Sequence, residues 1–114
     1  MAEDCIFCKI AAGEIPADVV YEDDNVMAFR DINPQAPVHI VIIPKKHMQS
    51  IMSVPAGDPV ISQLHAAANR IALREGIADT GFRLVNNCGE DGGQTVPHLH
   101  YHLLGGRYME WPPG

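Results

Sequence analysis

The segment His98-Leu99-His100-Tyr101-His102-Leu103-Leu104 places three histidines at alternate positions of one short stretch. Because a β-strand repeats every two residues, a strand over 98–104 projects these imidazoles from one face and the other side chains from the opposite face. Each imidazole has an ordinary pKa near ~6.5, so it can exchange protons near neutral pH. A solvated strand face rarely carries three imidazoles. The pattern therefore predicts a site that gathers ring nitrogens for nucleophilic or metal chemistry.

The length and composition predict one domain over 1–114. The chain has 114 residues, of which 46% are hydrophobic, enough for a core of its own. Its formal net charge of −6 argues against a nucleic-acid partner, since that affinity rests on basic patches. The first residues lack a basic leader, and no apolar run approaches the ~20 residues of a membrane span. We therefore expect a cytoplasmic protein without a membrane partner.

Hydrophobic spacing and turn residues predict the elements around the histidine segment. Asp4 is expected to cap a helix over 5–12 that Gly13 closes. Apolar residues at helical spacing predict a second helix over 60–75, stopped by Gly76. Five runs are expected to form strands: 19–22, 26–29, 38–43, 82–86 and 98–104. The sequence thus predicts an α+β fold with a mainly antiparallel sheet of about five strands and two helices.

A glycine-rich loop over 87–95 leads directly into the histidine segment. Its glycines let backbone N–H groups approach an oxyanion, and Gln94 and Thr95 add side-chain donors. We expect this loop to hold a phosphate beside the histidines, although a flexible connector is the plainer interpretation. The middle imidazole, His100, is then a candidate nucleophile, because neutral histidine needs no separate base. His102 is a candidate donor to the phosphoryl oxygens.

The three cysteines divide into a pair and a single residue. Cys5 and Cys8 have the C-x-x-C spacing of half a zinc site, and histidines are available for the other half. From the residues alone, zinc binding and two unliganded thiols both stay open. Redox chemistry is disfavoured, because a thioredoxin-like motif would follow a strand in a βαβ unit. Cys88 has no neighbour in the sequence and is interpreted as a small packing residue.

Many segments, in order, resemble the histidine-triad (HIT) superfamily and its nucleotide-binding branch. The family pattern alternates three histidines with apolar residues, and it matches 98–104. The other matching segments run almost end to end: Ile6-Phe7-Cys8-Lys9-Ile10, Glu14-Ile15-Pro16-Ala17, Tyr21-Glu22-Asp23-Asp24, Asp31-Ile32-Asn33-Pro34-Gln35-Ala36-Pro37, Ile43-Pro44-Lys45-Lys46-His47, Asp91-Gly92-Gly93-Gln94-Thr95 and Trp111-Pro112-Pro113-Gly114. The resemblance implies a HIT-like fold that pairs into a continuous sheet across a homodimer.

The resemblance also implies a purine-nucleotide hydrolase. Such enzymes cleave phosphorus–nitrogen bonds, with substrates such as adenosine phosphoramidates and aminoacyl adenylates, through a nucleotidyl-histidine intermediate. By position, His100 matches the nucleophile, and His102 and His39 match its phosphate-binding and orienting companions. AMP, GMP and their phosphoramidates are the implied ligands. Their implied contacts are Asn87, Gly93, Gln94 and Thr95 for phosphate and sugar, Asp31 for the ribose, and Phe7, Ile10, Ile15, Phe29 and Ile32 for the base. Trp111 is implied to reach the partner's active site.

The resemblance extends to a metal site. Family members that keep the two N-terminal cysteines resemble a zinc-bearing group, whose ligands match Cys5, Cys8, His47 and His98. A structural zinc is thus implied, with no open coordination position and no catalytic metal. The chain departs from the family at Tyr101, where an aliphatic residue is usual, and at Thr95, where serine is frequent. Either departure bears on substrate preference rather than on mechanism.

Three other functions stay open from the sequence. One is a dinucleoside polyphosphate hydrolase, which belongs to the neighbouring branch and shares the nucleophile. Another is a nucleotide-binding regulatory module that recruits a partner and whose weak catalysis is incidental. The last is an enzyme with a catalytic zinc on the histidine segment itself, which would lose activity to a chelator while its fold survived.

Overall fold

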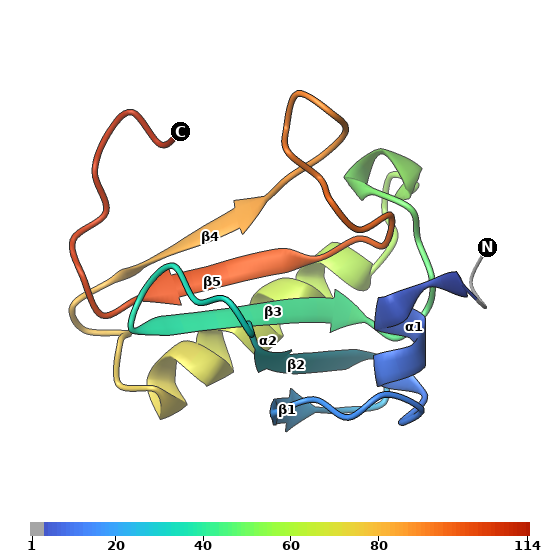
Figure 1. Cartoon of the computed structure of the whole chain (residues 1–114), viewed down its shortest axis with the longest axis horizontal. Helices are drawn as coiled ribbons and strands as arrows, with labels where there is room; N and C mark the ends of the chain where they lie inside the picture. Colours follow the sequence, from blue (N-terminus) through green and yellow to red (C-terminus); the bar gives the residue numbers. More distant parts are fainter. Residues whose placement is uncertain (1–3) are drawn as a thin grey trace.

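An antiparallel sheet of five strands carries the end of the histidine segment (Figure 1). The computed structural model describes residues 4–114. The strands are β1 (Val19–Glu22), β2 (Val26–Arg30), β3 (Val38–Pro44), β4 (Phe82–Asn86) and β5 (Tyr101–Gly105). Their order is β1-β2-β3-β5-β4, so the last strand of the chain inserts between β3 and β4. The predicted α+β fold with an antiparallel sheet is confirmed.

Two α-helices cover opposite faces of the sheet (Figure 1). They are α1 (Ile6–Ala11) and α2 (Val60–Arg74), and a short 3₁₀ helix, η2 (Ile51–Ser53), precedes α2. Ile40 and Ile42 of β3 pack on the α2 side, whereas Val41 and Ile43 pack on the α1 side. This strand is buried on both faces, which explains its nearly continuous apolar sequence. Within residues 4–114, no helix has the length and apolarity needed to cross a bilayer.

The α1 helix begins differently from the prediction. Its N-cap is Cys5 rather than Asp4, and the Cys5 Sγ accepts a hydrogen bond from the Cys8 backbone N–H at 3.4 Å. Cys5 has extended backbone angles, so the helix spans six residues, Ile6–Ala11, instead of 5–12. Sulfur is a weak acceptor, and this cap stabilises the helix less than a carboxylate would. The cysteine pair, rather than an acidic cap, thus defines the helix start.

The histidine strand is also shorter than predicted, because β5 begins at Tyr101 and not at 98. The β3–β5 ladder ends at the pair Ile42–Tyr101. Pro44 lacks an N–H, so it cannot donate to a ladder extended toward residues 98–100. The Leu99 N–H instead donates to the Met48 carbonyl at 2.6 Å. The predicted alternation nevertheless survives, because the residues between the histidines, Leu99, Tyr101 and Leu103, pack in the core on the α2 side.

Candidate active site and metal cluster

The three histidines of the segment take separate places on the α1 side of the sheet. His98 joins Cys5, Cys8 and His47 in one cluster. His102, on β5, contacts His39 of β3, with 2.9 Å between the His39 Nε2 and the His102 Nδ1. His100 lies between them, and its ring centroid is 5.1 Å from that of His102. Residues two positions apart therefore serve different parts of one continuous site.

The environment of His100 selects its tautomer. Its Nδ1 lies 2.7 Å from the carbonyl oxygen of His98. A carbonyl only accepts, so Nδ1 carries the proton and the Nε2 of the neutral ring keeps a lone pair. The side chain is buried, and the edge of Phe7 packs on it with ring centroids 5.1 Å apart. This is the tautomer that a nucleophilic imidazole requires.

A relay of hydrogen bonds orients His39 and His102 in the same way. The Gln35 backbone N–H donates to the His39 Nδ1 at 3.0 Å, so the proton of neutral His39 lies on Nε2. That Nε2–H donates to the His102 Nδ1, which leaves the His102 proton on Nε2. Asp31 stands beside the pair, with its Oδ2 3.4 Å from the His39 Nε2. His102 therefore presents an N–H donor.

Burial keeps this histidine pair neutral. Desolvation, together with the neighbouring His100 and His39, lowers the pKa of His102 to about 4, although Asp31 acts in the opposite direction. Desolvation also lowers the pKa of His39, again against the effect of Asp31. Both rings are then uncharged at neutral pH, in agreement with the tautomers assigned from their hydrogen bonds.

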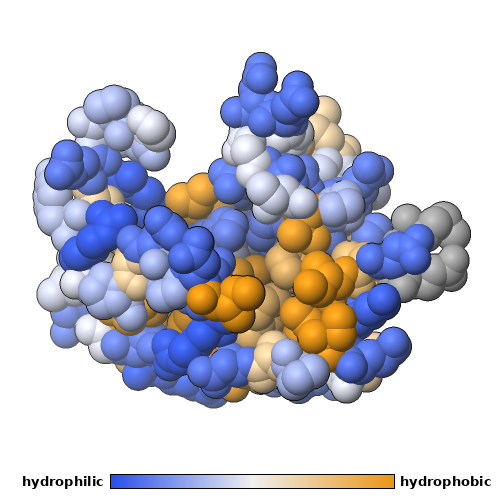
Figure 2. All heavy atoms as spheres, viewed as in Figure 1, coloured by the Kyte–Doolittle hydropathy of each residue, from blue (hydrophilic) through white to orange (hydrophobic). Residues whose placement is uncertain are grey.

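An apolar hollow of about 520 Å³ opens between α1 and the sheet. Six predicted nucleotide contacts line this apolar hollow: Phe7, Ile10, Ile15, Phe29, Asp31 and Ile32. Figure 2 shows apolar side chains gathered over α1 and beside it on this face. Ile32 at its rim is fully exposed, and Phe7 packs on Phe29 edge to face at 5.6 Å. Such a wall fits a planar, weakly polar ring, with a carboxylate available at one side.

A polar hollow of about 530 Å³ lies on the other side of Asp31 and the histidine pair. Its lining includes His39, His102 and the predicted phosphate contact Asn87, together with Arg83 and Arg107. The C-terminal tail closes it with two prolines at 112 and 113. His100 lines neither hollow, but its ring contacts Phe7 of the apolar hollow and His102 of the polar one. The nucleophile candidate thus sits at the junction.

Two of the predicted phosphate contacts lie elsewhere. Gln94 is engaged inside its own loop, where its Nε2 donates to the Gln49 and Val96 carbonyls at 2.8 and 3.0 Å. Its Oε1 accepts from the Gly89 N–H at 3.1 Å. Thr95 lines a separate hollow beside Cys5 and His47. The glycine-rich loop therefore folds as a turn held by Gln94, not as a flexible connector.

Gly93 and Trp111 complete the predicted contacts. Gly93 has a φ of 77°, a left-handed conformation that favours glycine, and its N–H donates to the Glu90 carbonyl at 3.0 Å. Trp111 is 80% exposed at the tail, and the guanidinium of Arg83 lies 5.9 Å from its ring centroid. Trp111 thus projects outward, beside the prolines of the polar hollow.

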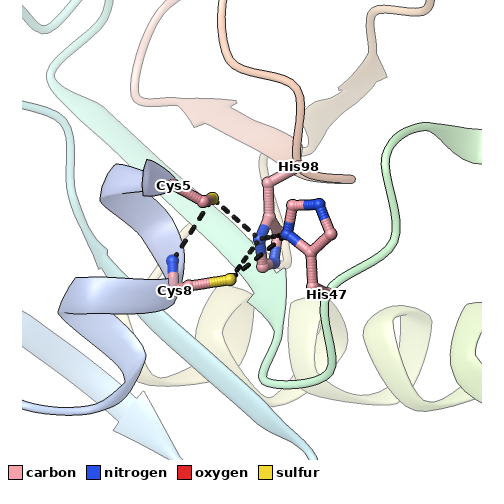
Figure 3. A group of neighbouring side chains, drawn as sticks. All are labelled: Cys5, Cys8, His47 and His98. Carbon is pink, nitrogen blue, oxygen red and sulfur yellow. Dashed lines mark hydrogen bonds between the residues drawn. The ribbon is translucent and has the colours of Figure 1, made fainter. Parts of the chain in front are cut away.

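A candidate metal cluster unites four side chains from three parts of the chain (Figure 3). Cys5 and Cys8 come from the start of α1, His47 follows β3, and His98 precedes β5. Their ligand atoms lie within 4.8 Å of one another. The Cys5 Sγ is 3.3 Å from the His98 Nδ1, and the Cys8 Sγ is 3.2 Å from the His47 Nδ1. The two imidazole Nδ1 atoms are 3.2 Å apart.

These distances suit a tetrahedral zinc ion. Ordinary Zn–S and Zn–N bonds set tetrahedral ligand atoms about 3.3–3.8 Å apart. The His98 Nε2 lies 2.9 Å from the Pro44 carbonyl and must donate to it, which turns the Nδ1 lone pair into the cluster. Without a cation, burial and the adjacent Cys5 raise the pKa of Cys8 to about 11. The ligand set therefore fits a cation that stabilises thiolates.

A second group, Asp31, His39 and His102, also has ligand atoms within 4.8 Å of one another. Its central contact, however, is the 2.9 Å hydrogen bond between the two rings. A cation between these nitrogens would have to replace the shared proton. This arrangement supports two imidazoles joined by a hydrogen bond more than it supports a catalytic zinc ion on the histidine segment.

Three contributors to the site were not found from the sequence. The Gln35 N–H selects the His39 tautomer, and Arg83 and Arg107 line the polar hollow. Gln35 acts through its backbone, which no residue pattern reveals. Arg107 lies only three positions after Leu104, but nothing in the spacing of two single arginines marks either of them.

Comparison with known proteins gives the wider relationship. The HIT domain family model matches residues 12–109. An uncharacterized HIT-like protein of Synechococcus elongatus is 52% identical over 115 residues, which cover 100% of both chains. The purine nucleoside phosphoramidase of Escherichia coli K12 is 51% identical over 108 residues, which cover 94% of this chain and 91% of that protein.

Solved structures agree with the sequence comparison. A HIT family hydrolase from Legionella pneumophila superposes with a TM-score of 0.95 at 54% identity, over 97% of this chain and 100% of that one. A histidine triad protein from Clostridium difficile has a TM-score of 0.92 at 55% identity, over 94% of each chain. The resemblance to the HIT superfamily is thus confirmed over nearly the whole chain. The chain belongs to the HIT domain family, and it is a hydrolase.

Proposed function

We propose that this protein is a purine nucleoside phosphoramidase that hydrolyses the phosphorus–nitrogen bond of nucleoside phosphoramidates. The observation that carries the proposal is the hydrogen bond from the His100 Nδ1 to the His98 carbonyl, which leaves a lone pair on Nε2. The 51% identity to the Escherichia coli purine nucleoside phosphoramidase supports the substrate class. Aminoacyl adenylates are further proposed substrates.

Substrate binding follows from the two hollows. The purine enters the apolar hollow against Phe7 and Phe29, and the Asp31 carboxylate accepts from the ribose hydroxyls. The phosphoryl group then lies near His100 and His102. The amine leaving group extends toward the polar hollow beside Asn87. Gly93, Gln94 and Thr95 remain proposed contacts of the nucleotide.

The reaction proceeds in two displacements at phosphorus. In the first, the His100 Nε2 forms a bond to phosphorus, and the bond to the amine breaks as the amine takes up one proton. The His102 Nε2–H donates to the phosphoryl oxygens and stabilises the charge that develops there. In the second, the oxygen of water bonds to phosphorus, the bond to His100 breaks, and one water proton is released. The products are the amine and the nucleoside monophosphate.

We also propose that Cys5, Cys8, His47 and His98 hold a structural zinc ion. The two thiolates and the two Nδ1 atoms would supply four ligands, which would leave a zinc ion no position for substrate or water. A zinc ion there supplies bonds that attach α1 to the sheet. The chemistry at phosphorus uses only this chain's imidazoles and a water molecule.

The finer points of assembly and location are part of the same proposal. The chain acts as a single domain over 1–114 and works in the cytoplasm on purine nucleotides, without a nucleic-acid or membrane partner. Two copies pair through β4 into one continuous sheet, because β4 is an edge strand. Trp111, exposed at the tail, then reaches toward the partner's site.

The covalent step has a direct test. Brief incubation with a slowly hydrolysed adenosine phosphoramidate, followed by rapid quenching at alkaline pH, should add the mass of an adenylyl group to the peptide that contains His100. The variant His100→Ala should lose this adduct and at least about 10³-fold in kcat. His65→Ala is the matched control, because His65 is exposed on α2. An adduct on another residue, or full turnover by His100→Ala, would contradict the mechanism.

The substrate class is tested by separate assays of the two kinds of substrate. We expect kcat/KM for an adenosine phosphoramidate to exceed that for diadenosine polyphosphates by on the order of 100-fold or more. Each contact worth about 1.4 kcal/mol changes this ratio about tenfold, and a few such contacts suffice. Both substrates are to be assayed at matched concentrations with release of AMP as the readout. Equal values, or a preference for the dinucleotide, would assign the protein to the polyphosphate hydrolases instead.

A further inference from the structure

We propose that the metal cluster positions the nucleophile, because its ligand His98 also supplies the carbonyl that holds His100 in the reactive tautomer. This inference rests on the proposed function, from which it takes the zinc ion and the role of His100. It adds a role for the metal that a merely structural clamp lacks. His98 is accordingly a positioning residue rather than a catalytic one.

The first connection runs through His98 itself. Its side chain is fully buried, its Nε2 donates to the Pro44 carbonyl at 2.9 Å, and its Nδ1 faces the cysteines. The carbonyl of the same residue accepts from the His100 Nδ1 at 2.7 Å. Any rotation of the His98 backbone would therefore move the acceptor on which the His100 tautomer depends. The ring contacts fix the side chain, and the side chain limits that rotation.

The second connection runs through α1. Phe7 lies between the two cysteines in the sequence, and its edge packs on both His98 and His100, with ring centroids 5.9 and 5.1 Å apart. The helix has only six residues and a sulfur N-cap, so it is too short to be stable by itself. Binding of both cysteines to one metal ion would keep Phe7 against His100. Both connections thus lead from the metal ligands to one imidazole.

Loss of the cation would weaken both connections. The cluster would then depend on thiol hydrogen bonds, which are weak, in place of bonds to a metal. His98 would then be held by its hydrogen bond to the Pro44 carbonyl and by weak contacts with the cysteines. The α1 helix would be held mainly by its apolar packing. His100 would then sample the opposite tautomer, whose Nε2 carries a proton and cannot attack phosphorus. We expect kcat to fall by about ten- to 100-fold, as it does when other residues that orient catalytic side chains without touching the substrate are lost.

Nitrogen NMR of the histidine rings tests the coupling without turnover. Zinc-loaded protein labelled with ¹⁵N-histidine should show the His100 Nδ1 as a protonated nitrogen and Nε2 as an unprotonated one. After chelation, the two signals should shift toward each other as tautomers interconvert, and added zinc should restore them. Amide signals of β2 and β3 report that the sheet persists, and kcat and KM are measured on the same samples.

Variants provide the matched comparison. Cys8→Ser should lower zinc content and reproduce the chelated spectrum, whereas Cys88→Ser, a cysteine outside the cluster, should leave zinc content and spectrum unchanged. If Cys8→Ser fails to fold, the chelated wild-type protein carries the comparison. Collapse of the sheet signals in that sample would overturn the proposal, because the cluster would then support the whole fold and not His100 in particular.

The remaining outcomes separate this inference from the proposed function. An unchanged His100 tautomer with unchanged kcat in metal-free, folded protein would overturn the coupling while the covalent adduct on His100 still stood. A change confined to KM would also overturn it, since the cluster would then serve only the apolar hollow. The predicted spectral shift without any nucleotide adduct on His100 would support the coupling and contradict the phosphoramidase mechanism.

Discussion

At the scale of single residues, the site depends on where each imidazole keeps its proton. His100 donates from Nδ1 to a carbonyl, whereas His102 accepts at Nδ1 from His39. Two chemically identical side chains on one short segment thus present opposite functions, a lone pair and an N–H donor. The difference comes entirely from the partner of the inner nitrogen. Substitutions that alter these partners should change which ring nitrogen carries the proton, even where the packing of the site is kept.

The buried histidine pair should make stability depend on pH. Burial lowers the pKa of folded His102 to about 4, whereas the unfolded side chain keeps an ordinary value of about 6.5. Below about pH 6.5 the unfolded chain takes up a proton that the folded protein refuses, so stability is complete above that pH and falls toward pH 4. Between about pH 7.5 and pH 5 we expect a loss on the order of 2 kcal/mol from this residue.

Urea unfolding of the wild-type protein and of His102→Gln at both pH values measures this loss. The variant should lose less stability on acidification than the wild-type protein, because its side chain does not titrate. His65→Gln, on the exposed surface of α2, should follow the wild-type protein. Equal losses in the wild-type protein and His102→Gln would contradict the expectation.

At the scale of elements, α2 is the main support behind the site. Its buried residues pack on Ile40 and Ile42 of β3, the strand that also carries His39 on its other face. Arg30 and Glu75 join the end of the helix to β2 through paired hydrogen bonds of 3.1 and 3.0 Å. The helix thereby supports the sheet from the face opposite to the one on which the histidines lie.

Two leucines on α2 test this support. Leu64 is 1% exposed, whereas Leu73 is 70% exposed. Leu64→Ala should lower the free energy of unfolding by about 2–5 kcal/mol, because it opens a cavity in the core. Leu73→Ala should change it by no more than about 0.5 kcal/mol. Chemical denaturation of the two variants gives both values, and similar effects would show that α2 does not pack as described.

At the scale of the whole molecule, the sheet has two edges, β1 and β4. An edge strand exposes unpaired N–H and C=O groups that can pair with another chain. The site approaches the β4 edge, because Asn87 follows β4 and Arg83 lies within it. A partner copy bound there would therefore lie beside the polar hollow.

Hydrogen exchange tests which edge is used. In concentrated protein, we expect backbone amides on the outer edge of β4 to exchange slowly, while those on the outer edge of β1 exchange fast and serve as the internal control. Dilution below the dimer dissociation constant should remove the protection of β4, and sedimentation should then report a monomer. Fast exchange of β4 at all concentrations would contradict pairing through this edge.

The site was predictable where it depends on residue types at fixed spacing. The cysteine pair was named from its C-x-x-C spacing and the six residues of the apolar hollow from the family resemblance, and the structure brings each set together. Gln94 and Thr95 were named as side-chain donors of the glycine-rich loop, and the structure places them in other surroundings. Their place in a glycine-rich loop indicated a phosphate site, whereas the hydrogen bond from Gln94 to the Gln49 carbonyl depends on a segment distant in the chain. Such contacts leave no local pattern.

The amino-acid sequence alone determined the faces of the strands, the two helices and the supply of imidazoles and thiols, because these follow from periods of 2.0 and 3.6 residues. Tertiary structure alone decided which histidine joins the cysteines and which keeps a free lone pair. That choice depends on Pro44, which ends the ladder, and on contacts such as that between Cys5 and His98, 93 positions apart. Periodicity reaches only a few residues along the chain, whereas a proton is placed by whichever atom folding brings opposite.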